Sequence, residues 1–173
     1  MKKSDLAPYH FEHFYSTYLN AIDDLELHNS LLEGMHEFVH FIGSIAKDCF
    51  QNTYMEGKWT LAEVLGHIID TERVFQYRAL RFSRNDSTPL PGFDQDLFVF
   101  SADYKLRTAE SFVEEYSAVR KSTITLFQNF TEAQLHRRGI ASQIPWSVAG
   151  LGFVISGHQA HHKRILEERY LGA

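Results

Sequence analysis

The sequence predicts an all-α fold: a four-helix bundle with a long crossover between its second and third helices. Apolar residues recur at spacings of three and four in four long segments, which is the period of an amphipathic helix. No segment shows a convincing alternation of apolar and polar residues, so we expect negligible strand content. The long connection, residues 84–107, can join two parallel helices, as some helical bundles require.

Two helices are expected before residue 50. A short one covers about residues 10–22, where aromatic side chains recur, and a longer one covers residues 24–47. The next helix has the clearest start, because Thr60 and Glu63 form a capping box that satisfies backbone N–H groups of the first turn. We expect this helix to run to about Ser83.

The C-terminal half of the chain completes the bundle. Residues 84–107 contain two prolines, a glycine and many turn-forming residues, which predicts a partly ordered crossover. Helices are expected over residues 108–129 and 147–170, with a single extra turn over residues 131–135. The last helix begins at a serine suited to an N-cap and stops at Gly172.

Composition limits the class of protein. A length of 173 residues with 44% hydrophobic content fits one domain, residues 1–173. The net charge of −5 and the lack of a basic stripe disfavour nucleic-acid binding. No apolar run is long enough for a membrane span. A single cysteine and the lack of an apolar leader at the N-terminus make the cytoplasm the default location.

Two histidines near the C-terminus carry the main functional signal. His158 and His162 are four residues apart, so both lie on one face of the last helix, within an apolar stripe that includes Leu151 and Ile155. A buried neutral imidazole without a partner costs roughly 1–3 kcal/mol. The pair therefore indicates a shared ligand, most simply a metal ion. The alternative is two core histidines bonded to other side chains.

Several other histidines compete for the place of a third ligand. His67 is favoured, because it lies on the flank of the apolar stripe of its helix and can reach a neighbouring helix. His36 and His40 form a second pair with the same spacing, but they lie away from the core stripe and we expect them to be solvated. His161 lies at the edge of its stripe and His136 in a polar loop, so neither is expected to bind the metal.

Three segments of the chain resemble the DinB/YfiT superfamily, the DinB-like metal-binding four-helix bundles. They are GKWTLAEVLGHIIDTERVFQYRALRF, PLPGFDQD and GHQAHHKRIL, and the resemblance covers the chain from about Leu25 onward. The resemblance implies an up-down-down-up bundle, frequent homodimers, and a divalent metal bound by His67, His158 and His162.

Three imidazoles leave a coordination position open, which is typical of a catalytic metal site. Zinc or nickel is favoured among the metals that imidazole binds. The zincin signature H-E-x-x-H is absent because Gln159 stands at the glutamate position, so a metalloprotease is not expected. Asp70, one turn beyond His67, is the candidate catalytic residue, as a proton acceptor or as a group that orients an imidazole.

The resemblance also implies chemistry on low-molecular-weight thiols, since some relatives are bacillithiol S-transferases or mycothiol-dependent isomerases. We therefore expect thiol-dependent S-transferase chemistry on a small-molecule substrate. Two alternatives stay open: a metal-dependent hydrolase, and a non-catalytic metal-binding dimer related to stress.

Charged and aromatic groups near these helices are weaker candidates. Arg78, Arg81 and Arg84 repeat near the end of one helix, where cations complement the helix dipole. We interpret them as solvated, with attraction of an anionic substrate as the alternative. Candidates for the walls and entrance of a pocket are Trp59, Trp146, Asp94 and Asp96.

Overall fold

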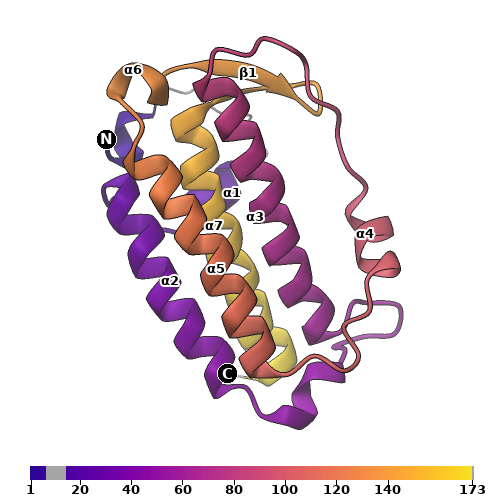
Figure 1. The fold of residues 1–173 in the computed structure, drawn as a ribbon. Coiled ribbons are helices and arrows are strands. Elements are labelled where there is room, and N and C mark those ends of the chain that lie inside the picture. The colour runs from indigo at the N-terminus through magenta and orange to yellow at the C-terminus, as the bar shows by residue number, and fades with distance from the viewer. Residues whose placement is uncertain (7–14, 173) are drawn as a thin grey trace.

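The computed structural model describes residues 1–6 and 15–172. Four long helices pack side by side as a bundle (Figure 1): α2 (Leu27–Ser44), α3 (Leu61–Ser83), α5 (Ala109–Gln128) and α7 (Val148–Ile165). α3 and α5 run parallel to each other and antiparallel to α2 and α7, which is the up-down-down-up order. The all-α four-helix bundle expected from the sequence is confirmed.

The predicted helix ends agree with the structure where a capping motif marks them. Thr60 and Glu63 form the capping box of α3, with the backbone N–H of Glu63 donating to Thr60 Oγ1 at 3.2 Å. Ser147 Oγ accepts from the backbone N–H of Gly150 at 2.9 Å and so caps α7. α7 continues as a π-helical segment, Leu166–Leu171, which stops at Gly172 in the left-handed conformation.

Short elements connect the long helices. Part of the helix expected over residues 10–22 lies outside the described residues, and α1 covers only Ser16–Leu19 of the remainder. The extra turn expected before the last helix is α6 (Glu132–Leu135). Among the described residues, the other helical elements are the 3₁₀ helices Lys3–Asp5 and Lys47–Gln51 and the helix α4 (Gln95–Ser101).

A β-hairpin corrects the expectation of negligible strand content. Strands β1 (Arg138–Ala141) and β2 (Ile144–Ser147) pair antiparallel and cover one end of the bundle (Figure 1). Ser142 and Gln143, the two residues of its turn, have φ angles of 53° and 64°. Such a turn matches the twist of a hairpin, but the residues usually found in it are Asn and Gly. The residues Ser142 and Gln143 therefore do not predict a hairpin turn.

The crossover between α3 and α5 runs along the outside of α3 and contains α4 (Figure 1). Asp94 caps α4 by accepting from the backbone N–H of Leu97 at 3.0 Å. Further along, the Tyr104 ring lies against Gly66 of α3, where an added Cβ would be 2.1 Å from a ring carbon. The glycine thus allows the crossover to approach the helix closely.

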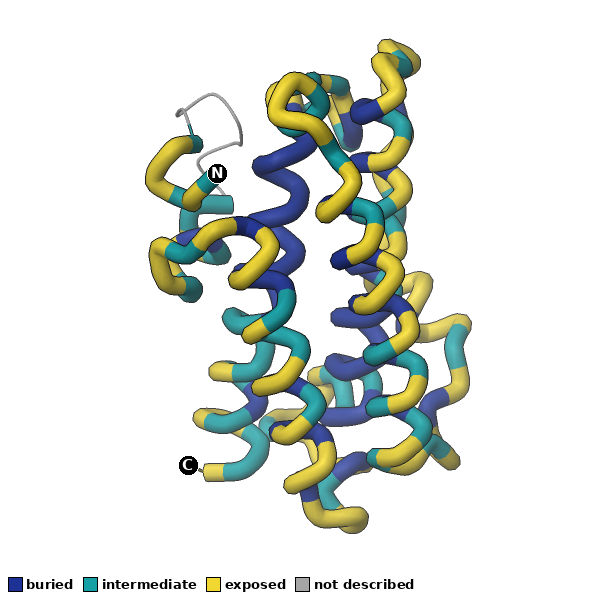
Figure 2. Tube along the Cα trace, turned by 60° about the vertical axis from the view of Figure 1, so that its left-hand side comes forward, coloured by how far each residue is buried: buried dark blue, intermediate teal, exposed yellow. Residues whose placement is uncertain are grey.

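Buried positions line the faces that the four helices turn toward one another (Figure 2). Near one end the core includes Phe82, Trp146 and Leu151, and near the other it includes Phe38 and Phe112. Apolar burial of this kind is the main stabilising term of the bundle. Within residues 1–6 and 15–172, no helix has both the length and the apolar character that crossing a membrane requires.

One ion pair crosses the core between α5 and α3. Arg120 donates from Nε to Glu72 Oε1 at 2.7 Å and from Nη2 to Oε2 at 2.9 Å, and both side chains are buried. Removing one partner would leave an uncompensated buried charge, so the two side chains fix how these helices pack.

Candidate metal centre

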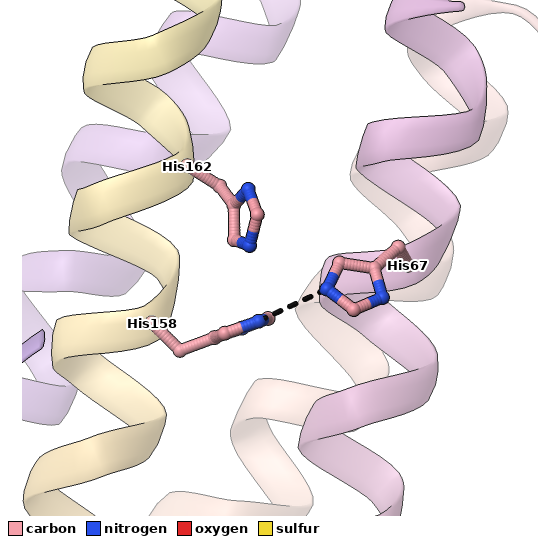
Figure 3. Close-up of side chains that lie close together, drawn as sticks. All are labelled: His67, His158 and His162. Carbon is pink, nitrogen blue, oxygen red and sulfur yellow. Dashed lines mark hydrogen bonds between the residues drawn. The ribbon is translucent and has the colours of Figure 1, made fainter. Parts of the chain in front are cut away.

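Three histidines from two helices converge inside the bundle. His67 projects from α3, and His158 and His162 project from successive turns of α7 into the space between the two helices (Figure 3). One ring nitrogen of each residue lies within 4.8 Å of the ring nitrogens of the other two. The structure therefore brings together the three histidines that the sequence singled out.

The spacing of these nitrogens suits a shared cation. The Nε2 atoms of His67 and His158 are 3.1 Å apart. Two imidazole nitrogens bound at about 2.0–2.1 Å to one tetrahedral ion would be roughly 3.3 Å apart. Within the described part of the chain, no other group of three His, Cys, Asp or Glu side chains is close enough to hold a metal ion.

Burial keeps the three imidazoles neutral. It lowers the pKa of His67 to about 4 and, together with the nearby histidines, lowers the pKa of His162 to about 3. The pKa of His158 lies well below its ordinary value, first because the ring is buried and then because the other histidines surround it. Neutral imidazole is the form that binds metals.

A threonine on the next turn of α3 contacts the far side of the His67 ring. The hydroxyl oxygen of Thr71 is 3.4 Å from His67 Nδ1. When Nδ1 carries the proton and donates it to this hydroxyl, the Nε2 lone pair is free for a metal. Thr71 is buried, so water competes little for this contact.

Two cavities reach the histidine cluster. The first, which we call the Arg78 cavity, has a volume of about 240 Å³ and is walled by His67 and His158. The second, the Trp59 cavity, has a volume of about 280 Å³ and is walled by His162. The ring of Trp59 lies 5.0 Å from that of His67 and supplies one aromatic wall of the second cavity.

The structure does not bring Asp70 to the cluster. Its carboxylate accepts hydrogen bonds from the Tyr104 hydroxyl at 3.1 Å and from Arg73 Nη1 at 3.2 Å, and it lines neither cavity. Asp70 instead connects α3 to the crossover. Asp96 does line the Trp59 cavity, whereas Asp94 caps α4.

The other candidate histidines are not members of the group of three, although the His161 ring packs edge-on against that of His162 at 5.2 Å. His36, His40 and His136 are exposed, as the sequence predicted. His161 is partly buried, and its ring packs edge-on against that of Tyr18 at 5.2 Å. Tyr18 also contacts the His158 ring at 5.3 Å, so one aromatic side chain covers both rings.

Two expectations about the surroundings of the site need correction. Arg78 is only 3% exposed and lines the cavity named after it, so it is not one of the solvated arginines. Arg81 pairs with Asp86 and Arg84 is exposed, as expected for the end of a helix. Trp146 lies in the core beside Phe75 and lines neither cavity.

The fold and the three histidines define a helical bundle with a candidate metal centre between two of its long helices. Residues 30–166 match the DinB superfamily, and the chain belongs to that superfamily. A protein of Oceanobacillus iheyensis, provisionally named a metal-dependent hydrolase, is 26% identical over 125 residues, which make up 70% of each chain.

Two solved structures share the fold. YfiT from Bacillus subtilis, described as a probable metal-dependent hydrolase with an unusual four-helix bundle topology, aligns with a TM-score of 0.67 at 14% identity. The alignment covers 91% of this chain and 87% of YfiT. A mycothiol-dependent maleylpyruvate isomerase aligns with a TM-score of 0.63 at 9% identity, over 98% of this chain and 63% of the isomerase.

Proposed function

We propose that this protein is a metal-dependent enzyme that transfers a low-molecular-weight thiol to a small electrophilic substrate. His67, His158 and His162 would hold one divalent cation, with zinc or nickel as the favoured metal. The observation that carries the proposal is the convergence of three neutral imidazoles from two helices. A single domain, a cytoplasmic location and a homodimeric state are further parts of the proposal.

The bound cation and the surrounding side chains would have different roles in the reaction. A bound divalent cation lowers the pKa of a coordinated thiol, so that the thiolate is present at neutral pH. The three histidines hold the reacting centre, and Thr71 orients the His67 ring. The rings of Trp59, Tyr18 and Phe75 lie against the cluster and supply apolar walls around it.

The transfer step balances without an oxidant or a reductant. The thiol proton passes to solvent, and the sulfur forms a bond to an electrophilic carbon of the second reactant. The leaving group on that carbon departs with the electron pair of the bond that breaks. Because the two cavities reach the cluster past different histidines, a thiol and an electrophile can approach it from two sides.

Hydrolysis is the second candidate, favoured by the names of the Oceanobacillus iheyensis relative and of YfiT. Hydrolytic enzymes commonly place a carboxylate beside the attacking water as a general base. Among the described residues, the only carboxylate that lines either cavity belongs to Asp96, which is exposed. Asp70 is engaged by Tyr104 and Arg73. This arrangement favours transfer over hydrolysis.

The test is conjugation of monochlorobimane with bacillithiol, mycothiol or glutathione by metal-loaded protein. We expect conjugation that is lost on metal removal and in His158→Ala, and retained in His40→Ala, which alters an exposed histidine outside the cluster. Turnover of esters or amides without any thiol would support the hydrolase instead. Tight metal binding without either activity would support a non-catalytic metal-binding protein.

A further inference from the structure

The Arg78 cavity contains a buried cation on the same helix face as the candidate metal centre. Arg78 follows His67 by eleven residues and Thr71 by seven, which are helical repeats that keep the three side chains on one face of α3. Eleven residues correspond to about 16 Å along the helix axis. The side chains of His67 and Arg78 line the same cavity.

The guanidinium of Arg78 has neutral partners. Its Nη2 donates to the carbonyl oxygen of Pro91 at 3.2 Å and to Ser142 Oγ at 2.8 Å. Nε and Nη1 make no hydrogen bond with any residue that the structure describes, and no carboxylate in residues 1–6 or 15–172 forms an ion pair with Arg78. A buried charge without a counter-ion is unfavourable, so a ligand anion would complete this environment.

The hairpin turn and the crossover contribute residues to the pocket around this cation. Ser142 comes from the turn of the β-hairpin and Gln95 from the first turn of α4. The rings of Phe75 and Phe93 lie 5.7 Å and 5.9 Å from the guanidinium carbon and make the surroundings apolar. Burial lowers the pKa of Arg78, yet an arginine keeps its charge at neutral pH.

We infer that the Arg78 cavity binds the carboxylate end of an elongated small-molecule substrate whose reacting end lies at the histidine cluster. This inference rests on the proposed function for the identity of the reacting end, whereas the carboxylate site consists of protein groups alone. A planar guanidinium matches a carboxylate through two parallel hydrogen bonds. One cation balances one negative charge, which favours a carboxylate over a phosphate monoester, whose charge is about −1.5 to −2 at neutral pH.

The carboxylate site can be tested without a metal. The probes are hexanoate and hexan-1-ol, which differ in charge but little in size, and calorimetric titration of metal-free protein measures their affinities. We expect hexanoate to bind more tightly than the alcohol and than inorganic phosphate. Equal affinities for hexanoate and hexan-1-ol, or tighter binding of phosphate, would overturn the inference.

Variants of two arginines on α3 separate the cavity from the general charge of the protein. Arg78→Met should weaken hexanoate binding by roughly 10- to 100-fold, the range expected for loss of a charged hydrogen-bond partner. Arg84→Met removes the same charge from an exposed position and should leave the affinity unchanged. Arg78→Lys keeps the positive charge but lacks the planar guanidinium, so it should bind hexanoate with intermediate affinity. This variant replaces Arg78→Met in the test if Arg78→Met does not fold.

A second pair of probes relates the carboxylate site to the candidate metal centre. Metal-loaded protein should bind 6-mercaptohexanoate more tightly than 6-mercaptohexan-1-ol, and Arg78→Met should abolish this preference while binding as much metal as the wild type. If the protein binds no metal, the proposed function fails and the hexanoate result still decides the inference. If metal binds and the preference is absent from the wild type, the inference fails and the metal centre stands.

Discussion

The hydroxyl group of Tyr116 on α5 donates a hydrogen bond to the side-chain oxygen of Gln159 on α7. The side-chain nitrogen of Gln159 in turn donates to the backbone carbonyl of Gly34 on α2 at 2.9 Å. Gln159 follows His158 directly in the sequence, yet its side chain faces α2 and α5, whereas the histidine faces α3. Its position therefore suits core packing and not metal chemistry.

This placement predicts the effect of Gln159→Glu, which completes an H-E-x-x-H sequence. The new carboxylate cannot donate to Gly34 and is buried in the core, so the free energy of unfolding should fall by about 1–3 kcal/mol. Urea unfolding measures this change. Zinc-loaded variant should gain no peptidase activity on casein, and the appearance of such activity would show that residue 159 reaches the metal.

Thr71→Val removes the hydroxyl that contacts His67 Nδ1 but keeps the shape of the side chain. We expect the affinity for zinc to fall by about tenfold, the lower end of the effect seen when a group behind a metal ligand is removed. Competition with a chromophoric chelator measures this affinity. Thr123→Val is the matched control, because Thr123 is also buried but bonds to the Val119 carbonyl on α5. Equal zinc affinities for Thr71→Val and Thr123→Val would show that Thr71 does not support metal binding by His67.

The metal-free protein should lose stability in acid. The pKa values of His67 and His162 in the folded protein are about 4 and about 3, whereas the ordinary histidine value is 6.5. Below pH 6.5 the unfolded chain therefore binds more protons than the folded chain, and the free energy of unfolding decreases as the pH falls toward about 3. Stability from these groups is fully present only above pH 6.5.

Urea unfolding of metal-free protein at several pH values between about 7 and 5 tests this dependence. This range spans the ordinary histidine pKa of about 6.5, which applies to the unfolded chain. The His162→Leu variant should take up as much as one proton fewer on unfolding. The slope of its unfolding free energy against pH should therefore be smaller by up to about 1.4 kcal/mol per pH unit. The same slope in the variant and the wild type would mean that the imidazole of His162 does not stay neutral in the folded protein.

The long helices could be predicted because each satisfies local rules. The Thr60 capping box and the Ser147 cap are visible in the sequence, and the apolar spacing between such signals is regular. The hairpin could not be predicted in the same way. Its turn places Ser142 and Gln143 at positive φ, and the energy that holds them there comes from the strands on either side and not from the turn residues.

The candidate site was partly visible in the sequence. The four-residue spacing places His158 and His162 on one face of α7, and the position of His67 on the flank of an apolar stripe points it toward a neighbouring helix. The sequence pattern predicts a solvated Arg78, because this residue stands near a helix end beside Arg81 and Arg84. Its burial depends on the crossover and the hairpin, which supply Pro91 and Ser142 as partners. Such long-range contacts leave no mark on the local pattern.

Metal content tests the central claim most directly. Wild type, His158→Ala and His40→Ala are loaded with zinc or nickel, freed of excess metal and analysed for bound ions per chain. We expect about one ion per chain in the wild type and in His40→Ala, and almost none in His158→Ala, because two imidazoles hold a cation much less tightly than three. A His158→Ala protein that folds and retains the metal content of the wild type would contradict the three-histidine centre.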